Sequence, residues 1–79
     1  MTTIRFFAGA AEAAGASSIE VEAGEGSVGD LLDEASRGND LLEKVIRRSI
    51  FLANGRAVGV DAPAKDITEL EVLPPFAGG

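Results

Sequence analysis

Alternating apolar and polar residues predict strands at both ends of the chain, which has 79 residues. The stretch Thr2–Ala8 places Ile4 and Phe6 on one face, with the two-residue period of a strand. Residues 18–23 alternate polar and apolar side chains, and in residues 69–73, before two prolines, Leu70 and Val72 alternate with two glutamates. Because proline cannot donate a hydrogen bond within a sheet, the last strand is expected to end before them.

A longer period marks the middle of the chain, where apolar residues recur every three or four positions, as on one face of a helix. Ser27 and Asp30 have the spacing of a capping box, so one helix is expected to begin after Ser27. It is expected to end near Arg37, with Gly38 as the residue that follows its C-terminal cap. Asn39 can cap a second, shorter helix. The buried face of that second helix is predicted to comprise Leu41, Leu42, Val45 and Ile46.

Two connections are predicted from their residue types. Residues 8–17 are rich in alanine, which favours helix, but Gly9 and Gly15 interrupt them, so we expect a loop with room for a helical turn. The pair Asn54-Gly55 is a strong hairpin signal between a third strand and a short return strand at residues 56–60.

This order of elements predicts an α+β fold: a mixed sheet of four to five strands with one main helix packed on one face. Residues 1–73 would form one domain, and residues 74–79 a flexible C-terminal tail. Phe51 is expected in the core, although Ile50 and Leu52 compete with it for the inward position. The other predicted core residues are Ile4, Phe6, Ile19, Val21, Leu31, Leu32, Val45, Ile46, Leu70 and Val72.

Phe7 and Leu73 fall out of phase with the core positions of their strands, and Phe76 follows beyond the prolines. An outward aromatic residue beside an apolar strand end suggests a surface that binds a partner. The alternative is that a small cluster under the glycine-containing loop or the tail covers Phe7.

Composition narrows the function classes. The chain has no cysteine, no histidine and a net charge of −6, which argues against disulfides, thiolate metal sites and catalysis by the chain itself. No metal site is expected. The negative charge disfavours nucleic acid and anionic membranes. Without a signal-peptide pattern or an apolar stretch of membrane-spanning length, a cytoplasmic protein is the simplest interpretation.

The C-terminal segment "LPPFAGG" combines a rigid start with a narrow end. A terminal diglycine by itself most often means a frayed end. Here it follows directly on a strand and on Pro74-Pro75. Since glycine has no Cβ, Gly78 and Gly79 could enter a tunnel closed to other residues and deliver the α-carboxylate of Gly79. A carboxylate becomes a good electrophile only after activation, for which adenylation by a separate ATP-using enzyme is the obvious route.

Nearly the whole chain resembles the ubiquitin-like sulfur carriers of the β-grasp fold, most closely the small subunit of molybdopterin synthase, the MoaD family. The resemblance rests on "IRFFAGAAEAAG", "VGDLLDEA", "FLANGRAV" and "LEVLPPFAGG". Members often have a Gly-Asp turn before the last strand, where this chain has Ile67-Thr68. The alanine-rich opening loop is also unusual.

The resemblance implies that the carboxylate of Gly79 is adenylated by an E1-like enzyme (MoeB-like) and converted to a thiocarboxylate. The large synthase subunit (MoaE-like) would then receive the sulfur for molybdenum cofactor biosynthesis. The two kinds of subunit would form a heterotetramer, in which the large subunit supplies the acid and base residues. The chain itself would bind no cofactor, because the ATP is used by the activating enzyme. Gly78 would keep the approach narrow, and the other residues expected to bind partners are Phe7, Leu73, Pro74, Pro75, Phe76 and Ala77.

Three other functions stay open. A related sulfur carrier could serve thiazole or cysteine synthesis with the same tail chemistry. A ubiquitin-like modifier would join Gly79 to a lysine through an isopeptide bond. A plain interaction module would use the apolar sheet face and leave its terminus inert.

Overall fold

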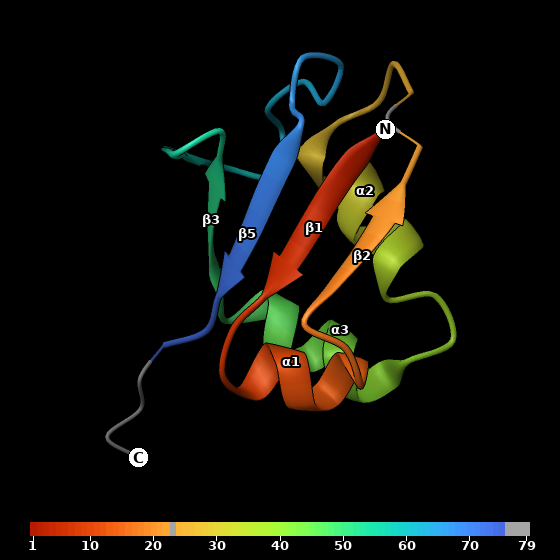
Figure 1. The fold of residues 1–79 in the computed structure, drawn as a ribbon, viewed down its shortest axis with the longest axis vertical. Helices are drawn as coiled ribbons and strands as arrows, with labels where there is room; N and C mark the ends of the chain where they lie inside the picture. Colours follow the sequence, from red (N-terminus) through yellow and green to blue (C-terminus); the bar gives the residue numbers. More distant parts are fainter. Residues whose placement is uncertain (23, 76–79) are drawn as a thin grey trace.

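The computed structural model describes residues 1–22 and 24–75. Figure 1 shows a sheet whose helices lie behind it and at its lower end. The strands are β1 (Thr2–Phe6), β2 (Ser18–Val21), β3 (Ile50–Ala53), β4 (Arg56–Val58) and β5 (Glu69–Leu73). The helices are α1 (Gly9–Ala14), α2 (Val28–Ala35) and α3 (Asp40–Arg47).

The sheet is mixed, with the strand order β2-β1-β5-β3-β4. The neighbours β1 and β5 run parallel, with Phe6 paired to Val72, and the other neighbouring pairs are antiparallel. The helix α2 lies behind β1 and β2 in Figure 1, so the face of the sheet turned toward the viewer is largely uncovered. The predicted α+β fold with a mixed sheet is confirmed.

The core lies between the sheet and the helices. Phe51 is 7% exposed, which confirms its inward position, and Val28, Ala53 and Ile67 join the core as well. Most of the predicted core residues are buried: Ile4, Phe6, Val21, Leu31, Leu32, Ile46, Leu70 and Val72. Two are only half-buried, Ile19 and Val45.

The prediction for Leu41 was wrong. Its side chain is 63% exposed, whereas Leu42 and Ile46 are buried. These two lie four residues apart and so share one face of α3, and Leu41 lies about 100° away from Leu42 around the helix axis. The short helix therefore buries Leu42 and Ile46, and Val45 in part, and leaves Leu41 in solvent.

The prediction of a loop for residues 8–17 was also wrong, because α1 occupies most of them. The helix ends at Gly15, whose φ of 72° is left-handed and whose N–H donates to the Ala11 carbonyl. Ala10 is fully buried, and the Asn39 side chain donates a hydrogen bond of 2.9 Å to the Ala13 carbonyl. These tertiary contacts stabilise a helix that is too short to be stable alone.

The second helix begins as predicted. Ser27 Oγ accepts from the Asp30 N–H at 3.3 Å, and Asp30 Oδ2 accepts from the Ser27 N–H at 2.9 Å, so the capping box is complete. The helix ends at Ala35, earlier than predicted, and Gly38 follows in a turn with φ 75°. Strand β2 ends at Val21 and strand β4 at Val58, so both end earlier than in the predicted ranges 18–23 and 56–60.

The turn at Ile67-Thr68 is built around Asn54 of the β3–β4 hairpin. Asn54 Oδ1 accepts from Thr68 N, Thr68 Oγ1 and Glu69 N at 3.2, 3.0 and 3.1 Å. Asn54 Nδ2 donates to the Asp66 carbonyl at 3.1 Å. One side chain therefore fixes the entry of the chain into β5 from the neighbouring hairpin.

Candidate functional site at the exit of the last strand

Three strands bring apolar residues together where the chain leaves β5. Ile50 of β3 pairs with Leu73 of β5. On the other side, the Phe7 N–H donates to the Val72 carbonyl at 3.2 Å, which extends the β1–β5 pairing by one residue. Because side chains alternate along a strand and Phe6, Phe51 and Val72 point inward, the neighbouring residues point to the uncovered face.

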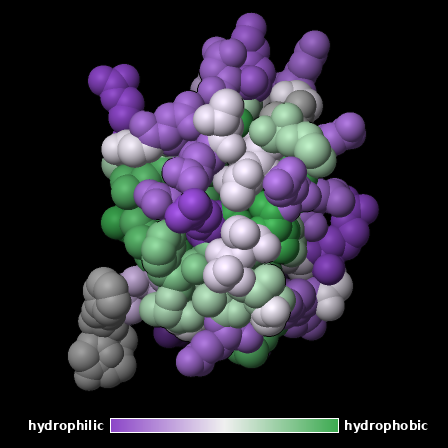
Figure 2. All heavy atoms as spheres, viewed as in Figure 1, coloured by the Kyte–Doolittle hydropathy of each residue, from purple (hydrophilic) through white to green (hydrophobic). Residues whose placement is uncertain are grey.

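The exit patch, as we call this surface, consists of Phe7, Ile50, Leu52, Leu73, Pro74 and Pro75. Ile50 is 63% exposed and Phe7 is 37% exposed, and Leu52, Leu73 and Pro74 are half-buried. A groove of about 270 Å³ runs between Arg48, Ile50, Leu73 and the two prolines. Figure 2 shows hydrophobic residues on the left and lower parts of this face, near the exit of the chain, and hydrophilic residues around its top and right.

The backbone around Phe7 is held tightly. Its N–H donates to β5, as described, and its carbonyl accepts from the Ala10 N–H at 3.0 Å. The next residue, Ala8, has φ 51° and ψ −127°, a region that a residue with a Cβ occupies only at a cost of about 1–3 kcal/mol. This strained turn directs the chain from β1 into α1 and leaves Phe7 on the uncovered face.

The structure brings four of the predicted contact residues together, Phe7, Leu73, Pro74 and Pro75. The remaining predicted site residues, Phe76, Ala77, Gly78 and Gly79, lie outside the described residues. Ile50 and Leu52 were missed as site residues. Their signal was available in the sequence, because an inward Phe51 forces both of its neighbours outward.

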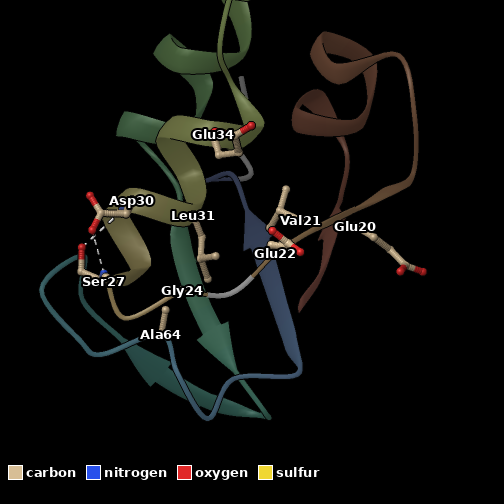
Figure 3. Close-up of a pocket in the computed structure, with 10 residues that line it drawn as sticks. Glu20, Val21, Glu22, Gly24, Ser27, Asp30, Leu31, Glu34 and Ala64 are labelled. Atoms are coloured by element: carbon tan, nitrogen blue, oxygen red, sulfur yellow. Dashed lines mark hydrogen bonds between the residues drawn. The ribbon is translucent and has the colours of Figure 1, made fainter. Parts of the chain in front are cut away.

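A second hollow, of about 580 Å³, lies between β2 and α2, at the opposite end of the sheet from the exit patch (Figure 3). Its carboxylates come from Glu20, Glu22, Asp30 and Glu34. They do not converge: Figure 3 shows Glu20 directed away from the hollow and Asp30 engaged with Ser27. Within residues 1–22 and 24–75, no group of three or more acidic side chains could hold a metal ion.

No helix among the described residues is both long enough and apolar enough to span a membrane.

A scan against family models matches residues 4–79 to the ThiS family. The chain belongs to the ThiS family. The resemblance to ubiquitin-like carriers noted from the sequence is thereby confirmed, and it covers nearly the whole chain. A search of curated proteins gives no match.

Solved structures place this ThiS-family chain among ubiquitin-like proteins. SAMP1 from Haloferax volcanii is 28% identical, with a TM-score of 0.79 and coverage of 99% of this chain and 98% of that one. A Pyrococcus furiosus protein provisionally described as molybdopterin converting factor, subunit 1, is 26% identical, with a TM-score of 0.77 and coverage of 95% and 97%. The Haloferax volcanii HVO 2177 protein is 31% identical, with a TM-score of 0.73 and coverage of 99% and 85%.

These matches support the class that the sequence predicts, a small ubiquitin-like domain of the ThiS and MoaD type that acts as a sulfur carrier or as a modifier. Both kinds of protein would need a surface beside the C-terminal segment that a partner can recognise, and the exit patch has that position.

Proposed function

We propose that this ThiS-family protein carries sulfur on the C-terminal carboxylate of Gly79 and supplies it as the small subunit of a molybdopterin synthase. The observation that carries the proposal is the exit patch, which lies where the chain leaves β5 toward Gly79. An exposed apolar surface in this position would allow a partner to bind the domain while the tail enters the partner's active site.

The proposed chemistry has three steps. An E1-like enzyme joins the Gly79 carboxylate to the AMP part of ATP, which releases pyrophosphate and gives an acyl adenylate. The outer sulfur of a persulfide then attacks the acyl carbon, forms a C–S bond and displaces AMP, which gives an acyl disulfide. A thiol finally cleaves the S–S bond inherited from the persulfide, forming a disulfide with the donor's remaining sulfur and leaving the thiocarboxylate on Gly79. The chain itself needs neither cysteine nor histidine for these steps, since its partners supply the reactive groups.

The acceptor in this proposal is a pterin precursor bound to a large synthase subunit. The similarity to the Pyrococcus furiosus protein, whose description names a molybdopterin converting factor subunit, supports that choice. The Pro-Pro-Phe sequence before the diglycine supports it too, because prolines stiffen the start of the tail and an aromatic residue buries a large area on a partner.

The test is the intact mass of the protein isolated from its own cells. Replacement of one terminal oxygen by sulfur adds about 16 Da to the chain ending at Gly79. We expect this species in the cell, and also in vitro after incubation with the activating enzyme, ATP and a persulfide donor. If only the carboxylate is found in both cases, the carrier proposal fails. Formation of molybdopterin with the large subunit would identify the acceptor, and success only in a thiazole or cysteine assay would reassign it.

A second candidate is a protein modifier, favoured by the similarity to SAMP1, a small archaeal modifier protein. In that case Gly79 would form an isopeptide bond with a lysine of a target protein. Conjugates that persist on denaturing gels and disappear on deletion of Gly79 would support the modifier, and their absence would favour the carrier.

A further inference from the structure

Glu71 occupies the centre of the uncovered face of the sheet. It belongs to β5, the middle strand, and is paired in register with Arg5 on β1 and with Leu52 on β3. Along its own strand, the next outward residue is Leu73 of the exit patch. The half-buried carboxylate therefore has patch residues on two sides.

The neighbouring cation does not pair with Glu71. Arg5 Nε lies 2.8 Å from Glu69 Oε2, so the guanidinium turns toward the carboxylate that is farther from the exit patch. In the part of the chain that the structure describes, the ion pairs are Arg5–Glu69 and Arg37–Glu34. Glu71 consequently has no cationic partner within 4.0 Å among these residues.

A partner that covers the exit patch cannot avoid Glu71, because Leu52 and Leu73 flank it. Covering a carboxylate with an apolar surface removes its water without replacing the lost hydrogen bonds, which opposes binding. A cation opposite the carboxylate offsets this loss, and a guanidinium suits it best because its planar fork matches the two carboxylate oxygens.

We propose that the enzyme that adenylates the tail presents a cationic side chain, an arginine in the best fit, to Glu71 within an otherwise apolar contact. This inference rests on the proposed function, because it assumes that such an enzyme binds the exit patch. In this arrangement the apolar residues supply contact area. The ion pair between Glu71 and the enzyme's cation favours this enzyme over other proteins that have an apolar surface but no such cation.

The test compares Glu71→Gln with Glu20→Gln. Glu20 is an exposed carboxylate of β2 on the same side of the sheet but away from the exit patch, so both variants lose the same charge. The probe is the purified E1-like enzyme of the same organism, and the readouts are its dissociation constant at low and high salt and the rate of adenylation. We expect Glu71→Gln to weaken binding about tenfold or more, with a smaller salt dependence, and Glu20→Gln to change it less than about twofold.

A charge reversal, Glu71→Arg, should weaken binding further than Glu71→Gln, while the thermal unfolding midpoint of both variants stays at the wild-type value. Equal affinity of wild type and Glu71→Gln would overturn the inference and leave the carrier proposal intact, provided that the wild-type tail is adenylated. An unadenylated wild type would overturn both. A fall in affinity that tracks a fall in unfolding midpoint would also overturn the inference, since Glu71 would then act in the fold.

Discussion

At the scale of single residues, the strained backbone of Ala8 helps to position the candidate site. Its φ of 51° and ψ of −127° are costly for a residue with a Cβ, yet the flanking hydrogen bonds of Phe7 and the burial of Ala10 hold it there. Nothing in the local sequence marks Ala8 as unusual. The strain arises because β1 must end beside β5 while α1 packs near α3.

Replacing Ala8 with glycine should stabilise the protein by about 1 kcal/mol, because glycine adopts this conformation freely and the gain exceeds its larger entropy in the unfolded chain. For a domain of this size the unfolding midpoint should rise by roughly 4–8 °C. The control is Ala13→Gly within α1, which should lower stability by about 1 kcal/mol. Similar losses in both variants would show that Ala8 is unstrained.

At the scale of elements, the β3–β4 hairpin reverses the chain and also holds the turn before β5. Asn54 supplies the left-handed backbone of its turn, with φ 50°, and its side chain also holds residues 66–69 before β5. This arrangement builds the turn at Ile67-Thr68. The sequence predicts the hairpin from Asn54-Gly55, but the second role depends on residues more than ten positions away.

Two substitutions separate these roles. Asn54→Gly keeps the turn conformation and loses the side-chain hydrogen bonds, so we expect it to destabilise the protein by about 2 kcal/mol. Asn54→Ala loses both and should cost about 1 kcal/mol more. Urea unfolding followed by circular dichroism measures the difference. If Asn54→Gly is as stable as wild type, the side-chain bonds to the turn contribute nothing.

At the scale of the whole molecule, the two sides of the sheet have different uses. One side carries the core and the helices, and the other brings together outward residues of β1, β3 and β5 at the exit of the chain. The exit patch has no helix over it in Figure 1. An exposed apolar surface of this kind adds little to the stability of the isolated domain, which is consistent with the proposed role of the exit patch in binding a partner.

The exit patch can be tested with two residues that are equally exposed. Ile50 in the patch and Leu41 on α3 are each 63% exposed. We expect Ile50→Gln to weaken binding of the activating enzyme about tenfold, and Leu41→Gln to leave it within about twofold of wild type, because only Ile50 lies beside the exit. Titration calorimetry gives both values. Equal effects of the two changes would contradict the assignment of the patch.

Deletion of Gly79 tests the separation of tail and domain. The last strand ends at Leu73, six residues before Gly79, so we expect the unfolding midpoint to stay within about 2 °C of wild type. Adenylation should be lost, because the terminal carboxylate would then belong to Gly78 and the tail would be one residue shorter. Pyrophosphate release with ATP and the activating enzyme is the measurement, and an active truncated chain would disprove the role of Gly79.

Local sequence patterns were enough to predict the periodic elements, the capping box, the hairpin, the inward positions of β1 and β5 and the resemblance to a carrier family, because these depend on residues close together in the chain. Contacts between distant segments were needed to show that residues 9–14 form a helix, that Leu41 is exposed and that Asn54 holds the turn before β5. The tertiary structure also placed Ile50 beside Leu73 and Leu52 beside Glu71. Each of these depends on which elements become neighbours, and short-range patterns do not specify that.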